Sequence, residues 1–142
     1  MAKINLGDIY VEISLKKYED YDEYHWGKFD VEIKSPYVNY SSQNREHFMM
    51  EEVDHIIEKM EQLLEGKIHG REDVWGLEND IMFTLIHESP YDEYRMKISI
   101  MLENKDKYYG RWSIEMSENS IKDFLSEFKK EHEKASRRIM MY

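Results

Sequence analysis

Apolar residues at every second position recur in several segments of this chain, beginning with residues 8–15. There Ile9, Val11 and Ile13 fall on one face, and more polar residues fall on the other. Such alternation predicts a β-strand with one buried and one exposed face, and it returns in residues 28–34, 94–103 and 111–117. Residues 80–88 are apolar on both faces, which predicts a central strand. Weaker strands are expected at residues 37–42 and 73–77.

Two other segments have the three- and four-residue spacing of an amphipathic helix. In residues 49–65 the apolar face consists of Val53, Ile56, Ile57, Met60, Leu63 and Leu64. Glu51 and Glu52 suit the positive start of this helix, and Gly66 is placed to end it. The second helix is predicted over residues 118–135, with an apolar stripe of Ile121, Phe124, Leu125 and Phe128.

The predicted order is strands, helix, strands, helix, over 142 residues, a length that suits one domain. Short links between consecutive strands, such as residues 104–107, favour antiparallel hairpins. We therefore expect a single α+β domain over residues 1–142, folded as a two-layer sandwich. Its mainly antiparallel sheet is expected to have about five to seven strands, with two amphipathic helices on one face.

The negative charge of the chain is unevenly distributed. The formal net charge is −10, from 30 acidic and 20 basic residues. Residues 1–104 carry a net charge of −12, and residues 105–142 carry +2. Such a field repels nucleic acid and anionic lipid and attracts a basic partner. Acidity that only keeps a small protein soluble explains the same numbers.

The sequence lacks the residues and motifs that several classes of function require. Cys is absent, which excludes disulfides, thiol nucleophiles and Cys-based metal sites. The glycines form no phosphate-binding loop, and no metalloprotease or serine-hydrolase motif is present. No apolar run approaches the ~20 residues of a membrane span, and the first residues lack the apolar stretch of a signal peptide. We expect a non-enzymatic, cytoplasmic protein without a cofactor or a metal.

Two sets of side chains leave a chemical role open. Glu51 and His55 lie four residues apart on one face of the first predicted helix, a spacing that can supply two metal ligands. An exposed helix face accounts for the same residues. His87, near the end of a predicted strand, is either a catalytic base or a structural histidine. An enzyme that used these groups would need a pocket around them.

The string Tyr-Asp-Glu-Tyr occurs twice, at residues 21–24 and 91–94, and both copies lie between predicted strands. The first belongs to residues 18–26, where carboxylates alternate with aromatic rings. Carboxylates pair with Arg and Lys, and Tyr and Trp give rigid contact area at interfaces. Chance repetition, or a merely solvated acidic loop, explains the same pattern. The candidate partner-binding residues are Tyr18, Asp20, Tyr21, Asp22, Glu23, Tyr24, Trp26, Tyr91, Asp92 and Glu93.

The chain resembles the WapI-type immunity proteins over nearly its whole length. The matching stretches are Leu-Leu-Glu-Gly at residues 63–66, Glu-Asn-Asp-Ile-Met-Phe at residues 78–83, Leu-Glu at residues 102–103, and a closing helix built on Ile121, Phe124 and Leu125. Asn79 stands where the family pattern has proline, and no proline follows Glu103. The resemblance implies an α+β fold, no enzyme activity, and a toxin domain, often a nuclease, as the partner.

The sequence therefore leads to two hypotheses of function. The first is an immunity-type protein that neutralises a toxin by binding it directly, with the acidic aromatic segment on a basic surface of the toxin domain. The alternative is an acidic adaptor or a nucleic-acid mimic that binds another protein. In both hypotheses the partner is a protein, because a net charge of −10 opposes direct contact with nucleic acid or membrane.

Overall fold

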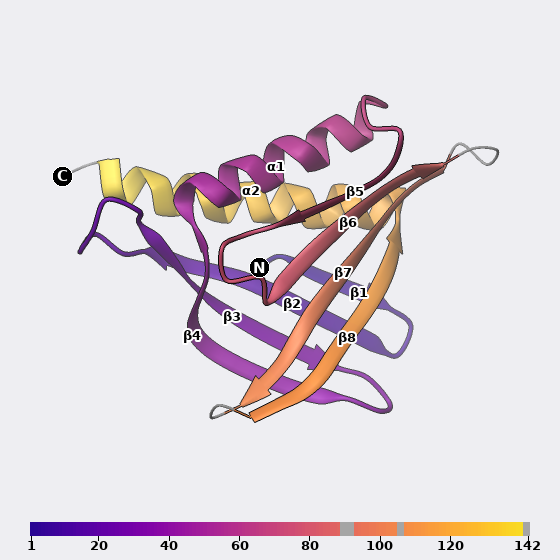
Figure 1. Cartoon of the computed structure of the whole chain (residues 1–142), viewed down its shortest axis with the longest axis horizontal. Coiled ribbons are helices and arrows are strands. Elements are labelled where there is room, and N and C mark those ends of the chain that lie inside the picture. The colour runs from indigo at the N-terminus through magenta and orange to yellow at the C-terminus, as the bar shows by residue number, and fades with distance from the viewer. Residues whose placement is uncertain (89–92, 105–106, 141–142) are drawn as a thin grey trace.

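A computed structural model of the chain describes residues 1–88, 93–104 and 107–140. These described residues form eight strands and two helices (Figure 1). The first four strands are β1 (Lys3–Leu6), β2 (Ile9–Tyr18), β3 (Trp26–Lys34) and β4 (Asn39–Met49). Helix α1 (Met50–Leu64) follows, and after it β5 (Gly70–Trp75), β6 (Ile81–Glu88), β7 (Glu93–Asn104), β8 (Lys107–Ser117) and helix α2 (Glu118–Met140).

The strands form two antiparallel sheets of four strands each, with the orders β1-β2-β3-β4 and β5-β6-β7-β8. The α+β class is confirmed, but the prediction of one sheet with five to seven strands was wrong. Neighbouring strands in each sheet are also neighbours in the sequence, and α1 carries the chain from one sheet to the other. Alternation of apolar residues reports that a strand has a buried face, but it does not report which sheet the strand joins.

Most predicted elements are present with shifted ends. Helix α1 confirms the helix predicted over residues 49–65, whereas α2 continues to Met140, beyond the predicted end at residue 135. Strand β6 pairs with both β5 and β7, which confirms the prediction of a strand inside a sheet. Strand β4 runs on to Met49, beyond the predicted residues 37–42, because hydrogen bonds to β3 hold its polar residues. Strand β1 was not predicted, since its four residues are too few to show a period.

The two helices lie side by side and together cover both sheets (Figure 1). Helix α1 contacts β4, β5 and β6, whereas α2 contacts β1 and β2 of the first sheet and β7 and β8 of the second. The predicted cover of helices on one face is therefore shared between two sheets. In the part of the chain that the structure describes, no helix is long and apolar enough to cross a membrane.

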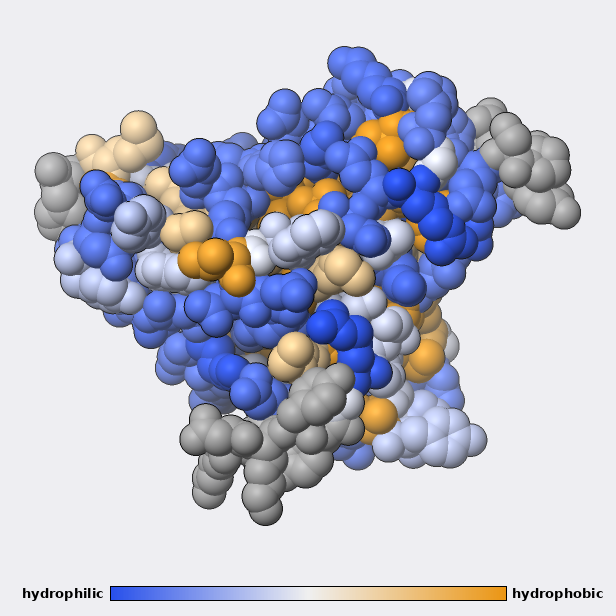
Figure 2. All heavy atoms as spheres, in the orientation of Figure 1, coloured by the Kyte–Doolittle hydropathy of each residue, from blue (hydrophilic) through white to orange (hydrophobic). Residues whose placement is uncertain are grey.

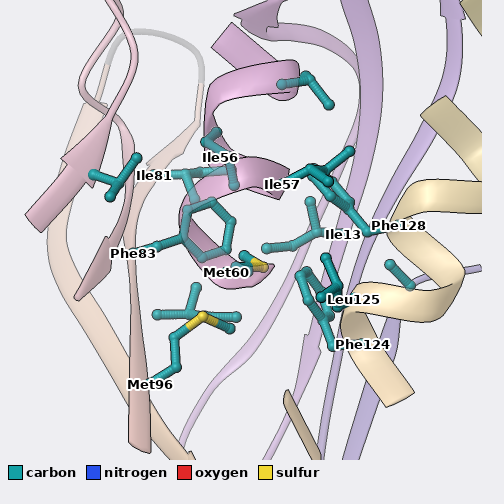
Figure 3. Packing of buried hydrophobic residues seen from close by; sticks show 14 of the residues in the cluster. Ile13, Ile56, Ile57, Met60, Ile81, Phe83, Met96, Phe124, Leu125 and Phe128 are labelled. Atoms are coloured by element: carbon teal, nitrogen blue, oxygen red, sulfur yellow. The ribbon is translucent and has the colours of Figure 1, made fainter. Parts of the chain in front are cut away.

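One core of buried apolar residues joins both sheets to both helices. Phe83 of β6 is fully buried, and its ring lies 6.1 Å from that of Phe48 in β4. On its other side the rings of Phe124 and Phe128 in α2 lie 6.2 Å and 6.5 Å away. Figure 3 shows Phe83 and Met96 facing the labelled side chains of α1 and α2. Phe83 therefore connects the second sheet directly to the first sheet and also to α2.

The carboxylate of Glu131 in α2 fastens the start of the chain to the second strand. One oxygen accepts the backbone N–H of Ala2 at 3.0 Å, and the other accepts the Ser14 hydroxyl at 2.9 Å. Burial raises the pKa of Glu131 above the ordinary glutamate value, and these two hydrogen bonds oppose the shift. The bridge therefore places a carboxyl group where its ionised form is disfavoured.

Replacing Phe83 with Ala should lower the free energy of unfolding by about 3–5 kcal/mol, because it leaves a cavity between the two sheets and α2. Urea denaturation of the wild-type and variant proteins measures this difference. Leu77→Ala is the matched control, since Leu77 is 73% exposed and its loss opens no cavity. An equal effect of the two substitutions would contradict the central position of Phe83.

The stability difference between the wild type and Glu131→Gln should depend on pH. Since the pKa of Glu131 is raised in the folded protein, its favourable contribution is present at low pH and is lost as pH rises through that pKa. Gln does not ionise: its amide oxygen accepts the N–H of Ala2, and its amide nitrogen donates to the Ser14 hydroxyl oxygen, the reverse of the wild-type hydrogen bond. Denaturation between about pH 4 and pH 7 should show the wild type losing stability relative to the variant. A constant difference would contradict the assigned shift.

Candidate partner-binding surface

The loop between β2 and β3, residues 19–25, has a backbone fixed by its own hydrogen bonds. The Glu19 N–H donates to the carbonyl oxygen of Trp26 at 2.8 Å, which closes the loop at its base. One carboxylate oxygen of Asp22 accepts the N–H groups of Tyr24 and His25, at 2.9 Å and 3.2 Å. His25 has a φ of 51°, in the left-handed region that His adopts more readily than most residues. The loop therefore keeps its shape without an apolar core of its own.

This loop presents both aromatic and acidic side chains to solvent. Tyr21 and Tyr24 are 61% and 56% exposed, and Asp20 and Glu23 are also exposed. Within the described residues, Asp20 and Glu23 form neither an ion pair nor a side-chain hydrogen bond, so their charges are free for a partner. Asp22 and Trp26 are half-buried: Asp22 shapes the turn, and Trp26 begins strand β3.

The Tyr21 hydroxyl is held at the side of the loop. It donates to a carboxylate oxygen of Glu46 at 2.8 Å, and the Lys28 ammonium group donates to the same oxygen at 2.8 Å. The hydrogen bond to Glu46 raises the pKa of Tyr21 to about 12, and the bonds from Lys28 and Tyr21 lower the pKa of Glu46. The Tyr21 hydroxyl is therefore neutral at physiological pH. Glu46 fixes the position of its oxygen, and its ring stays exposed.

Tyr18 lies inside the protein, beneath the loop. Its side chain is 4% exposed, and its hydroxyl lies 2.6 Å from Nδ1 of His132 in α2. Nε2 of His132 lies 2.6 Å from the carboxylate of Asp54 in α1. An ionised carboxylate only accepts, so in neutral His132 the Nε2–H donates to Asp54 and Nδ1 accepts from Tyr18. Burial raises the pKa of Tyr18. Tyr18 therefore joins β2 to both helices and is not offered to a partner.

The described part of the second Tyr-Asp-Glu-Tyr string, Glu93 and Tyr94, lies far from the first string. Tyr91 and Asp92 lie outside the described residues, and Glu93 is exposed at the start of β7. Figure 1 places the end of β6 and the start of β7 at one end of the long axis and the β2–β3 loop at the other. Tyr94 is half-buried, with its ring 4.5 Å from that of His87. Glu93 therefore does not share a surface with Tyr21 and Tyr24.

The side chains considered for catalysis or metal binding lie outside two surface hollows in the described part of the chain. Glu51 and His55 are exposed on α1, and Nδ1 of His87 lies 2.9 Å from the carbonyl oxygen of Ile68. Among the described residues, no group of three His, Cys, Asp or Glu is placed to hold a metal ion. Two surface hollows of about 500 Å³ and 470 Å³ lie beside β1 and beside β7, and Glu51, His55 and His87 line neither of them.

A second buried histidine pair was not expected from the sequence. Nδ1 of His47 in β4 lies 2.6 Å from a carboxylate oxygen of Asp80, just before β6, and both side chains are buried. The pair links the first sheet to the second, and the ring of Phe29 lies 6.0 Å from that of His47. Such a pair has no signal in the sequence, because its partners are 33 residues apart.

The sequence also gave no reason to select the turn between β5 and β6, residues 76–80. Trp75 and Leu77 are 53% and 73% exposed, although large apolar residues usually avoid water. One oxygen of the Glu52 carboxylate accepts the N–H of Met49 at 2.8 Å, and the other accepts the N–H of Leu77 at 2.5 Å. A Cβ atom at Gly76 would lie 2.8 Å from that carboxylate and 2.9 Å from the Phe48 ring. The turn is therefore packed tightly against the start of α1.

The fold and its surface define a small acidic α+β protein that presents charged and aromatic side chains on fixed loops. The chain belongs to the immunity protein WapI-like family, whose model matches residues 3–136. The resemblance seen in the sequence is thereby confirmed over nearly the whole chain. No curated protein matches the sequence. Asn79, where the resemblance in the sequence implied a proline, has a φ of 53° and donates its N–H to Gly76, neither of which proline permits.

Replacing Tyr18 with Phe should lower the free energy of unfolding by about 1–3 kcal/mol, because Nδ1 of His132 loses its partner at 2.6 Å and keeps only the Ser136 hydroxyl at 3.5 Å. The measurement is chemical denaturation at neutral pH. Tyr37→Phe removes the same hydroxyl from a residue that is 97% exposed and should change stability little. If both substitutions were neutral, the Tyr18–His132 hydrogen bond would contribute nothing to folding.

Proposed function

We propose that this protein neutralises a toxin by binding the toxin domain directly, and that the β2–β3 loop meets a basic surface of that domain. Membership of the immunity protein family supports a toxin as the partner. The binding site is proposed from the chemistry of this loop. Within the described residues, Asp20 and Glu23 form no ion pair, and they lie beside the exposed rings of Tyr21 and Tyr24.

The charges of the loop suit recognition of lysine and arginine. Lys17 already pairs with Glu19 at 3.6 Å, and Lys28 pairs with Glu46 at 2.8 Å, so the nearby cations do not neutralise Asp20 and Glu23. Unpaired acids on a chain segment of net charge −12 accelerate the encounter with a basic surface, and exposed tyrosines then supply contact area. A nuclease, whose substrate groove must attract phosphates, is the class of toxin that best matches such a loop.

The fixed backbone of the loop lowers the cost of binding. Because Asp22 and the Glu19–Trp26 hydrogen bond already order residues 19–25, little conformational entropy is lost when a partner binds. Binding by this loop would block the toxin surface that it covers. The same chemistry serves the alternative function, an acidic adaptor or nucleic-acid mimic, and a partner other than a toxin would distinguish that alternative.

The test of the proposal uses the toxin domain encoded beside the gene of this protein. Asp20→Asn with Glu23→Gln removes two charges and leaves Asp22, which shapes the loop. The association rate constant at low ionic strength should fall about three- to tenfold, with a smaller change in dissociation. Stopped-flow or surface-based kinetics at several salt concentrations measures both constants.

The matched control is Asp8→Asn with Asp123→Asn, which removes the same charge from exposed positions away from the loop. Asp8 precedes β2, whose ten residues place it roughly 30 Å from the loop. The control should keep the wild-type association rate. If the wild-type protein neither bound the toxin domain nor protected cells that express it, the proposed function would be wrong. Binding with equal association rates for both double variants would leave the function and exclude the loop.

A further inference from the structure

We infer that the β5–β6 turn, with Trp75 and Leu77, is a second part of the partner-binding surface and holds the bound toxin domain in place. This inference rests on the proposed function, since it names the toxin domain as the occupant. It adds an apolar contact to the acidic loop, and therefore requires a partner with an apolar recess beside its basic residues.

Four of the seven exposed large apolar side chains among the described residues lie on the β2–β3 loop and at the β5–β6 turn. Among the described residues, those with large exposed apolar groups include Tyr21 and Tyr24 on the β2–β3 loop and Trp75 and Leu77 at the β5–β6 turn. Of the others, Tyr37 lies in the β3–β4 turn and Met1 at the start of the chain. Met140 ends α2, and Figure 1 shows that end of the helix at the same end of the molecule as the β2–β3 loop. In the orientation of Figure 1, Figure 2 shows apolar atoms over the β5–β6 turn surrounded by hydrophilic ones.

Hydrogen bonds place the loop and the turn on the same structural support. The Met50 N–H, at the start of α1, donates to the carbonyl oxygen of His25 in the loop at 3.1 Å. Two residues later in α1, Glu52 accepts the N–H of Leu77. Both segments are therefore bound to the first turn of α1, and Figure 1 shows them on either side of it. A partner that covers the start of this helix touches both.

The turn is built to present its side chains rigidly. Trp75 ends an edge strand and pairs with Met82 of β6. Gly76 packs against Glu52 and Phe48, and Asn79 donates its N–H to the Gly76 carbonyl oxygen at 3.2 Å. Large apolar groups on an ordered backbone lose little entropy on binding, which makes Trp75 and Leu77 suitable anchors at the centre of an interface.

The charges around the turn indicate the nature of the partner. Glu51, next to Glu52 in α1, and Glu78, next to Leu77 in the turn, are both exposed, and within the described residues neither forms an ion pair. An apolar centre with an acidic rim is complementary to an apolar recess bordered by Lys or Arg. Since the acids of the β2–β3 loop have the same sign, one basic partner satisfies both segments.

The two segments should have different kinetic roles. Exposed charges act at a distance and mainly change association, whereas buried apolar anchors act only in contact and mainly change dissociation. Trp75→Thr with Leu77→Ser keeps a strand-forming residue at the end of β5 and removes both apolar groups. With the toxin domain encoded beside the gene, the dissociation rate constant should rise about tenfold or more, with the association rate constant within about twofold.

Tyr37→Ser is the control, because it removes an aromatic group that is 97% exposed in the β3–β4 turn. It should dissociate at the wild-type rate. An unchanged dissociation rate for Trp75→Thr with Leu77→Ser would overturn the inference while leaving the proposed function intact. A wild-type protein that formed no complex would overturn both.

Hydroxyl-radical footprinting of the wild-type protein provides a measurement that needs no variant. Oxidation of Trp75 and Leu77 should fall severalfold when the toxin domain is bound, while oxidation of Tyr37 should stay the same. Equal oxidation of Trp75 in the free and bound protein would overturn the inference even if the double variant failed to fold.

Discussion

Each sheet of this protein has an apolar face, and the two helices cover both faces at once. Phe83 shows how this is done, since its ring contacts Phe48 of the first sheet and Phe124 and Phe128 of α2. Removing either helix would expose both sheets, so the sheets and helices must form together. The ends of the strands are not needed for this packing, and the loops there are free to carry other chemistry.

The first turn of α1 connects the core to two loops at the surface. It lies directly after β4, so its position is fixed by the first sheet, and Glu52 connects it to the turn that begins the second. His25 approaches the same helical turn from the β2–β3 loop. Two loops that are about fifty residues apart in the sequence thereby become neighbours, held through backbone groups and a single carboxylate.

The sequence predicted what depends on local spacing and missed what depends on distant contacts. Alternation and helical periodicity located α1, β6 and most of the other elements, because each of these has one face against the core. The number of sheets was wrong, because alternation does not identify the partner of a strand. Tyr18 was placed with the exposed loop, since nothing near it indicates that His132, 114 residues later, would receive its hydroxyl. The exposure of Trp75 and Leu77 was not predicted, because apolar residues in a strand are normally buried.

The side chains of Asp20, Glu23 and Tyr24 hold no part of the fold together, since the loop is shaped by Asp22 and by backbone hydrogen bonds. Their replacement should therefore change the free energy of unfolding little, and mutations that fit a changed partner can accumulate there. Two proteins could share this core and differ only at such positions, yet each would recognise its own partner and ignore the other's. The separation of the packed framework from a few exchangeable side chains makes this architecture well suited to diversification.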